Sequence, residues 1–499
     1  MAVSSRYIAE QRLASSAGRS GFRMPNPGDV FILTAFAWAA LCFAMVAIGG
    51  RFFNQIARLS SSRAFRELLS VDQTAIAGIM VVGLLAIATG YFLLVRYPKT
   101  LLAFLLFGMS FSAARWEPVY APAFAMRYLV IVFVAVSAGI FTLLNFWRII
   151  ATPYYRLVAL YLAWIGLIVL INGFKLRDIW YFATEVTLML GLGLAWISRY
   201  DNYEKLIELN KLIAYMAIPI TILHMISPIV IDSAFSIGRF QSYSDRATGF
   251  ATTYSLLLVP LFWLSMYEER KLPKQIATAF ALIGMSLVLL SGTRNATVAS
   301  IIGIGVLWWI FRTRIFVYLI ALAMLGLLVQ ILLSGNEAIE TVTSRLGSTE
   351  NTRLGAWALY GRLSMESPIF GYGYAGLPSA VYGASLIDFI GRFATINVPG
   401  VHNYYLGLAV RFGIPAVLLS CTIIYLAFRT SWQVVFNKYV PDIEKRAYIM
   451  PCAMFTVVVA EGLFEDPLGS TGKGSLHGVM FAISAFVMVV YGRRLLEAA

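Results

Sequence analysis

Residues 275–311 read QIATAFALIGMSLVLLSGTRNATVASIIGIGVLWWIF and decide the class of fold. The stretch holds two apolar runs, at 275–292 and 295–311, separated by a short turn that contains Arg294. Each run approaches the roughly 20 residues that a helix needs to cross the hydrocarbon core of a bilayer. The stretch therefore predicts a hairpin of two membrane helices.

The same pattern fills most of the chain, and we expect an all-α integral membrane protein with about 12–14 transmembrane helices. The third apolar run is short, which fits a tilted or re-entrant segment. The fourteen runs lie at 30–50, 74–95, 100–113, 128–146, 156–172, 180–198, 211–232, 248–266, 275–292, 295–311, 315–334, 402–428, 447–465 and 474–491.

Composition agrees with this class. Of 499 residues, 60% are hydrophobic and only 13% are charged, whereas soluble proteins carry about 25% charged residues. Mean hydropathy is +0.77. The net charge is +14, but the Lys and Arg residues are scattered between the apolar runs. This scatter indicates contact with anionic headgroups and an anionic substrate, so we predict membrane lipids as partners and no nucleic acid.

One polar segment, 335–401, interrupts the apolar pattern. Short basic connectors, among them Arg199–Lys211, Glu268–Lys274 and Arg429–Arg446, predict the cytoplasmic side by the positive-inside rule. The long segment is nearly neutral and is predicted to lie on the outer face. The expected organisation is a cytoplasmic tail at 1–29, a transmembrane bundle at 30–334, a large outer loop at 335–401, C-terminal transmembrane helices at 402–491 and a cytoplasmic tail at 492–499.

Three polar residues fall at one predicted membrane depth. Arg246 begins the run at 248–266, Arg294 lies in the outer turn of the hairpin, and His402 ends the long loop. Arg binds phosphate bidentately, and His exchanges a proton near neutral pH. The alternatives are that each Arg only anchors its helix to headgroups, and that His402 and Asn403 form a capping pair. We predict catalytic roles for His402, Arg294 and Arg246.

Arg411 is a charge inside an apolar run. It lies nine residues beyond His402, which is about 13 Å at 1.5 Å per residue. A charge at such a depth usually faces a partner or a polar cavity. Glu461 and Glu465 on the next helix are the candidate partners, and we predict that Arg411 contacts the substrate.

The long loop contains SPIFGYGYAG at 367–376. Its glycines permit tight turns, and Tyr372 and Tyr374 offer flat faces on which sugar rings can stack. An ordinary turn explains the pattern equally well. Residues 352–360 predict an amphipathic helix lying along the interface. Arg353 in this helix, together with Asn403 and Tyr404, completes the predicted substrate-binding set.

Several patterns are absent from the sequence. There is no His-Glu-x-x-His, no Cys/His cluster and no phosphate-binding Gly-Lys-Ser/Thr loop, which argues against metal-assisted chemistry and ATP hydrolysis. Cys42, Cys421 and Cys452 lie within apolar runs and indicate no disulfide framework. We expect His224 and His477 to be packing residues. The sequence therefore predicts neither a metal site nor a cofactor.

The order of these motifs resembles the O-antigen ligase and O-antigen polymerase superfamily, which includes exopolysaccharide polymerases. The resemblance rests on Ser-Gly-Thr-Arg at 291–294, Pro-Ile-Phe-Gly-Tyr-Gly at 368–373, and His402-Asn403 followed by Gly413, and it spans roughly residues 240–430. It implies a membrane glycosyltransferase-type (GT-C-like) bundle in the bacterial inner membrane, with the active site facing the periplasm. It also implies that Arg294, Arg246 (with Gly249) and His402 bind pyrophosphate and assist transfer, without a metal ion.

The resemblance further implies a glycan linked to undecaprenyl pyrophosphate as the donor. The acceptor is either another lipid-linked repeat unit, for a polymerase, or lipid A-core, for a ligase. We favour a polymerase because the long loop is not strongly basic, and a chain-length regulator is a further expected partner. A flippase or transporter of lipid-linked glycans is the alternative from another class; it predicts internal inverted repeats, and we find none.

Overall fold

Seven helices in the described part of the chain are long and apolar enough to cross a membrane. The computed structural model describes residues 98–111, 114–172, 176–196, 202–231, 234–236, 239–312, 353–374, 402–465 and 476–499. Apart from one two-stranded hairpin, the elements formed by these residues are helices. The all-α membrane class predicted from the sequence is therefore confirmed.

The N-terminal part of the bundle follows the predicted runs, with one difference. The run at 128–146 belongs to a much longer helix, which begins at Glu117-Pro118 and is kinked at Asn145. Proline is favoured in the first turn of a helix because its missing N–H would lack a partner there anyway. The helices are α6 (Pro98–Phe111), α7 (Glu117–Ala151), α8 (Pro153–Ile171), α9 (Leu176–Val186), the π-helix η1 (Thr187–Trp196), α10 (Tyr203–Met225) and α11 (Ser227–Val230).

Residues 275–311 form the predicted hairpin. Its helices are α13 (Lys271–Leu290) and α14 (Arg294–Phe311). Gly292 in the turn has φ of 61°, a conformation that glycine adopts without strain. Before this hairpin come the short strands β1 (Phe235–Ser236) and β2 (Arg239–Phe240), which pair antiparallel, and the helix α12 (Ala247–Tyr267).

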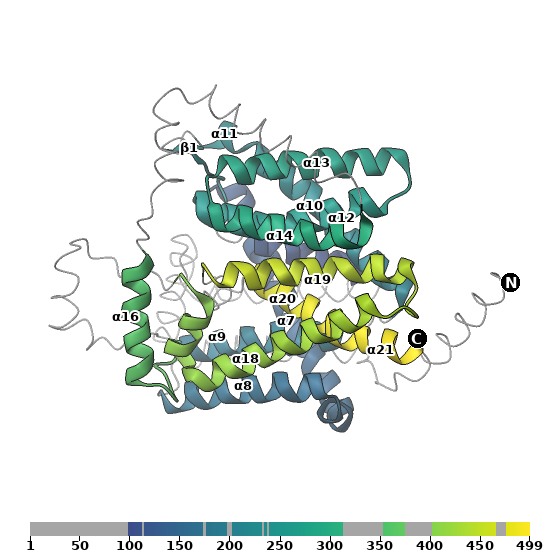
Figure 1. Ribbon diagram of the computed structural model, residues 1–499. Coiled ribbons are helices and arrows are strands. Elements are labelled where there is room, and N and C mark those ends of the chain that lie inside the picture. Colours follow the sequence, from purple (N-terminus) through teal and green to yellow (C-terminus); the bar gives the residue numbers. More distant parts are fainter. Residues whose placement is uncertain are drawn as a thin grey trace, which may run out of the picture.

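The C-terminal part contains the helix of the long loop and the last helices of the bundle. The described part of the loop is 353–374, and it includes α16 (Arg353–Glu366). Figure 1 shows α16 running across the direction of α13, α14, α18 and α8, which suits an interfacial helix. Its apolar residues do not gather on one face, so the predicted amphipathic character is wrong. The other elements are α18 (Tyr404–Phe436), α19 (Asp442–Gly462), α20 (Leu476–Phe486), the π-helix η4 (Val487–Tyr491) and α21 (Gly492–Ala498).

The core of the bundle surrounds α12, which is the most deeply buried of the seven membrane helices. Its large side chains Phe250, Tyr254, Phe262 and Trp263 are fully buried. α12 packs against α10, α13, α14 and α19, and Figure 1 shows these helices side by side. The start of α12 is therefore held from several sides.

The basic connectors meet at one end of the bundle, as the sequence predicted. Lys211 Nζ lies 2.8 Å from Glu268 Oε2, and Trp263 Nε1 donates to the carbonyl of Arg446 at 2.7 Å. The hydrogen bond from Lys211 holds the pKa of Glu268 below its usual value. The starts of α12, α14 and α18 lie at the opposite end.

Several predictions concern residues outside the described ones. These are the tail at 1–29 and the runs at 30–50, 74–95 and 315–334. The predicted total of 12–14 membrane helices therefore stays a prediction, as do the domain boundaries.

Candidate functional site

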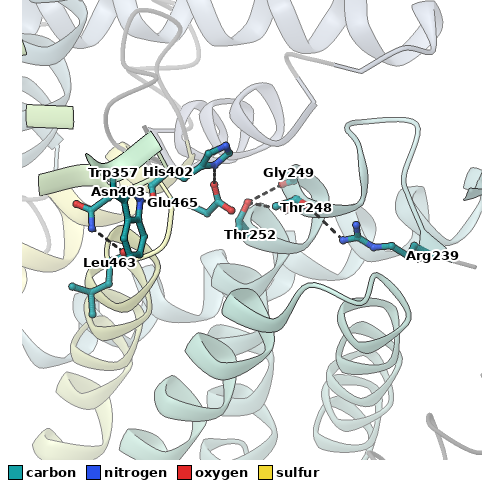
Figure 2. A network of polar contacts seen from close by, with 9 residues as sticks. All are labelled: Arg239, Thr248, Gly249, Thr252, Trp357, His402, Asn403, Leu463 and Glu465. Carbon is teal, nitrogen blue, oxygen red and sulfur yellow. Dashed lines mark hydrogen bonds and ion pairs between the residues drawn. The ribbon is translucent and has the colours of Figure 1, made fainter. Parts of the chain in front are cut away.

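His402 lies directly before α18, at the junction of loop and bundle. Its backbone φ of 48° is uncommon for a residue other than glycine. The Asn403 side chain fixes the turn, because its oxygen accepts from Leu406 N at 2.9 Å and its amide donates to Leu463 O at 2.9 Å. Trp357 Nε1 donates to the carbonyl of His402 at 3.3 Å. Contacts from α16, α18 and the end of α19 thus hold this histidine (Figure 2).

The imidazole of His402 has a carboxylate partner. Its Nδ1 lies 2.8 Å from Glu465 Oε2, and the exposed fractions of the two side chains are 39% and 13%. In the neutral tautomer whose Nδ1–H donates to this carboxylate, Nε2 carries the lone pair. An imidazole oriented in this way is suited to general-base catalysis.

Arg246 is exposed at the N-cap position of α12. Its backbone N–H donates to Asp245 Oδ1 at 2.6 Å. One turn further, a Cβ atom at Gly249 would collide with the Asp245 carboxylate. The Arg-x-x-Gly spacing therefore has a local cause: the glycine leaves room for this carboxylate at the helix start.

Arg294 is the exposed first residue of α14. The turn before it is closed by a hydrogen bond from Thr293 N to Ser291 Oγ at 3.2 Å. Neither N-cap residue, Arg246 in α12 or Thr293 in α14, makes a side-chain capping hydrogen bond. The N–H groups at a helix start carry partial positive charge. Together with the two guanidinium groups, these helix starts favour an anionic ligand such as phosphate.

Arg239 of β2 joins the two helix starts, and sequence analysis did not find it. Its Nε donates to the carbonyl of Ser291 at 2.6 Å, and its Nη2 donates to Thr293 Oγ1 at 3.1 Å and, at 3.5 Å, toward Thr248 Oγ1. The only sequence signal is a basic residue in a polar stretch shortly before Arg246. Its partners become apparent only when the hairpin folds back onto α12 and α14.

The pair formed by His402 and Glu465 lies beside the start of α12. Ser255 of α12 donates to Glu461 Oε1 of α19 at 2.6 Å. The helices run antiparallel, so Glu465, one turn beyond Glu461, lies level with Thr252, about one turn before Ser255. Figure 2 shows Glu465 between His402 and Thr252, with Arg239 on the far side of Thr248. The structure thus brings His402, Arg246 and Arg294 to one end of the bundle.

Residues 278–421 match the family model described as O-antigen ligase. This match supports a place for the chain in the O-antigen ligase and polymerase superfamily. The matched region contains Arg294 and His402, whereas Arg239, Arg246 and Glu465 lie outside it. No curated protein matches the chain.

The match to the O-antigen ligase model supports a ligase- or polymerase-type role in polysaccharide assembly. It implies lipid-linked glycan substrates and a membrane glycosyltransferase-like activity. With the seven apolar helices, it also indicates a multi-pass membrane protein. In the part of the chain that the structure describes, no cluster of His, Cys, Asp or Glu could hold a metal ion.

The Pro-Ile-Phe-Gly-Tyr-Gly segment at 368–373 docks against a break in α18. At Gly413 the backbone turns to φ of 77°, and the carbonyl of Ile369 occupies the space that a Cβ atom would need. Docking supplies hydrogen-bond partners to backbone groups near the break, which otherwise would be costly inside a membrane protein. The bonds run from Tyr372 N to Val410 O (2.9 Å), from Gly373 N to Arg411 O (2.7 Å) and from Ile414 N to Pro368 O (2.7 Å).

This docking favours the turn interpretation of the segment over sugar stacking. Gly371 and Gly373 have φ of 60° and 72°, which lets their backbone lie close to α18. Tyr374 is buried, and its ring packs edge-on against Phe412. Tyr372 is half-buried, and burial and the neighbouring Glu366 raise its pKa. The stacking roles of both tyrosines stay predictions, and the buried position of Tyr374 does not favour one.

A buried polar cluster lies below this segment, around Glu185 of α9, a residue that sequence analysis did not consider. Tyr374 donates to Glu185 Oε2 at 2.5 Å, and Tyr161 donates to Oε1 at 3.0 Å. The charge of Arg411 acts on the same carboxyl group. Tyr404 is buried with its hydroxyl 3.0 Å from Ser420 Oγ. Arg411 and Tyr404 thus lie within the bundle, and their substrate-binding roles stay predictions.

Asn403 and Arg353, the remaining residues predicted to bind substrate, lie at the starts of helices. Asn403 uses its amide group to cap α18 and to reach Leu463, as the capping interpretation expected. Arg353 begins α16, but its side chain lies outside the described part of the structure. Substrate binding by either residue stays a prediction.

The other two histidines are buried, as expected for packing residues. His224 lies among Phe111, Phe250 and Tyr254, with its Nδ1 2.7 Å from Ser242 Oγ. His477 has a specific partner that the sequence did not reveal. Its Nε2 lies 2.6 Å from Glu461 Oε2, the carboxyl group that also accepts from Ser255.

Proposed function

We propose that this protein transfers a glycan from undecaprenyl pyrophosphate to a sugar hydroxyl group, without a metal ion, at the periplasmic face of the bacterial inner membrane. The observation that carries the proposal is that one end of the bundle gathers a carboxylate-oriented histidine and two exposed arginines. These groups come from segments that are far apart in the chain, and the match to the O-antigen ligase model supports lipid-linked glycans as substrates.

Arg246 and Arg294 bind the pyrophosphate of the donor in this proposal. Both are exposed at helix starts without a side-chain cap, Arg246 as the N-cap of α12 and Arg294 as the first residue of α14. When the bond between the sugar and the pyrophosphate breaks, negative charge develops on the leaving oxygen. Fixed guanidinium groups stabilise that charge, and removal of one such donor typically costs about 100-fold to 1,000-fold in rate.

His402 accepts the proton of the acceptor hydroxyl group. Glu465 holds the Nδ1 proton, so Nε2 faces the acceptor as the base. As the proton moves to Nε2, the hydroxyl oxygen forms the new glycosidic bond, and the undecaprenyl pyrophosphate leaves with the electron pair of the broken bond. Glu465 stabilises the imidazolium that results.

The acceptor in this proposal is another lipid-linked repeat unit, so that the enzyme is a polymerase of O-antigen or exopolysaccharide. The nearly neutral charge of the segment 335–401 supports this choice, because phosphorylated core sugars favour a basic surface. Transfer to lipid A-core is the second candidate, and the description of the matching family model favours it.

Replacing Arg294 by alanine tests the site. We expect Arg294→Ala to lower product formation by about 100-fold or more, with membrane insertion intact. Arg270→Ala is the matched control, because Arg270 is an exposed arginine at the start of α13, at the opposite end of the bundle. Normal polymer from well-expressed Arg294→Ala protein would contradict the assignment.

A deletion strain separates the acceptors. Surface glycan with a single repeat unit and no ladder indicates a polymerase. Full-length glycan that stays on undecaprenyl indicates a ligase. Intermediates trapped on the cytoplasmic side would instead indicate a flippase and contradict the proposed transfer reaction.

A further inference from the structure

The hairpin that carries Arg239 is fixed to the bundle by its neighbouring residue. Phe240 is buried, and its ring lies 5.2 Å from that of Phe250 in α12. Arg239 itself is half-buried, unlike the exposed Arg246 and Arg294. Its guanidinium group therefore reaches α12 and α14 from a backbone position that α12 anchors.

The guanidinium group of Arg239 binds both helix starts at once. Ser291, whose carbonyl accepts from Nε at 2.6 Å, is the C-cap of α13, and Thr293, whose hydroxyl accepts from Nη2 at 3.1 Å, is the N-cap of α14. Thr248, toward which Nη2 points at 3.5 Å, lies in the first turn of α12. Thr293 adds a direct link, because its hydroxyl points to the carbonyl of Ala247 at 3.4 Å.

These contacts set the separation of two other residues. Arg294 directly follows Thr293, and Arg246 lies two positions before Thr248. If the starts of α12 and α14 moved apart, Arg246 and Arg294 could no longer contact the two phosphates of one pyrophosphate group. A flexible Lys at position 239 would keep the positive charge but could not form the planar fork that reaches Ser291 and Thr293 together.

We propose that Arg239 is a positioning residue, which fixes the distance between Arg246 and Arg294 so that both bind the same pyrophosphate. This inference rests on the proposed function of the two exposed arginines. Arg239 acts through them, by holding the Ser291–Thr293 turn against α12. Small displacements of binding groups are expensive in such sites, because about 1 Å can cost roughly 100-fold in rate.

A double-mutant cycle tests this inference with undecaprenyl pyrophosphate as the probe. The full-length protein in nanodiscs is compared as wild type, Arg239→Lys, Arg294→Ala and the double variant, with Arg270→Lys as the matched control. Binding of undecaprenyl monophosphate and the midpoint of thermal unfolding are measured for each variant. Residues that act together show non-additive effects, whereas independent residues add.

We expect Arg239→Lys to weaken binding of the pyrophosphate lipid by about tenfold or more. We expect a smaller effect on the monophosphate lipid, an unfolding midpoint like that of the wild type, and no further weakening when Arg294 is already alanine. Additive losses, equal losses for both lipids, or normal binding by Arg239→Lys would overturn the inference. Normal binding by Arg294→Ala would instead overturn the proposed function.

A second variant keeps the test decisive if Arg239→Lys does not fold. Thr293→Val removes the hydroxyl group that links Arg239 to α14, and Thr293→Ser retains it. The inference predicts weakened pyrophosphate binding by the valine variant and nearly normal binding by the serine variant. Equal binding by the two variants would overturn it.

Discussion

Two histidine–glutamate pairs lie one helical turn apart at the end of α19. In one, Glu465 binds His402 at 2.8 Å, and 39% of the histidine side chain is exposed. In the other, Glu461 binds His477 at 2.6 Å, and the exposed fractions are 0% and 4%. The same two residue types thus form one pair that is partly exposed and one pair that is fully buried.

The difference in burial suits the buried pair to holding helices together and the exposed pair to contact with a substrate. A buried ionisable pair must satisfy its own hydrogen bonds, and loss of one partner leaves an uncompensated group in a nonpolar environment. Glu461 meets this requirement with His477 and Ser255, which tie α19 to α20 and α12. His402 has one nitrogen on Glu465 and an imidazole that reaches the surface, which suits the proton exchange that we propose for it.

The largest effect is expected at the exposed pair. His402→Ala removes the base and should lower the transfer rate by about 100-fold to 10,000-fold, the usual contribution of a positioned acid or base. Because His402 lies before α18 and is partly exposed, thermal unfolding should change little. The rate is measured in proteoliposomes with equal amounts of folded protein. A rate within about twofold of the wild type would contradict the role of His402 as the base.

Substitutions in the buried pair, Glu461 and His477, should lower the stability of the fold. His477→Ala leaves Glu461 without its imidazole and should destabilise the fold by about 3–5 kcal/mol, measured by thermal unfolding in detergent. Replacing both residues with leucine should destabilise the fold much less, because apolar side chains often replace a buried ion pair without loss. If the single and double variants unfold alike, the pair does not hold the helices together.

The smallest effect concerns how His402 is held. Asn403→Ala removes the cap of α18 and should cost about 1 kcal/mol of stability, with some loss of transfer rate because the turn at His402 loosens. Asn403→Asp keeps a capping oxygen and is the matched control. An alanine variant that is as stable and as active as the aspartate variant would show that the cap does not position His402.

The sequence predicted the helices where hydrophobicity alone decides them. The runs at 248–266, 275–292 and 295–311 correspond to α12, α13 and α14 within a few residues, because charged connectors mark their ends. The run at 402–428 ends eight residues before the end of α18, since Arg429–Phe436 is helical despite its polar residues. The break at Gly413 was missed because it depends on a docked segment from elsewhere in the chain.

Part of the site could be predicted from the pattern of apolar runs. The alternation of runs places Arg246, Arg294 and His402 at one end of the bundle, and the structure agrees. The partners of these residues were not predictable, because Glu465 and Arg239 reach the site only through tertiary packing. Glu461 and Glu465 were the candidate partners of Arg411. In the structure Glu461 contacts His477 and Ser255, Glu465 contacts His402, and the charge of Arg411 acts on Glu185 of α9.

The most direct test compares Glu465→Gln with Glu461→Gln, measured as transfer rate per folded molecule and as unfolding midpoint. Glu461 lies in the last turn of α19 and Glu465 lies three residues beyond its end, so the two substitutions are matched. We expect Glu465→Gln to lower the rate about tenfold or more with a normal midpoint, because the base loses its orienting charge. Glu461→Gln should lower the midpoint and leave the rate per folded molecule nearly normal. An unchanged rate for Glu465→Gln, or an equal loss of rate for both variants, would contradict the assignment of chemistry to the exposed pair.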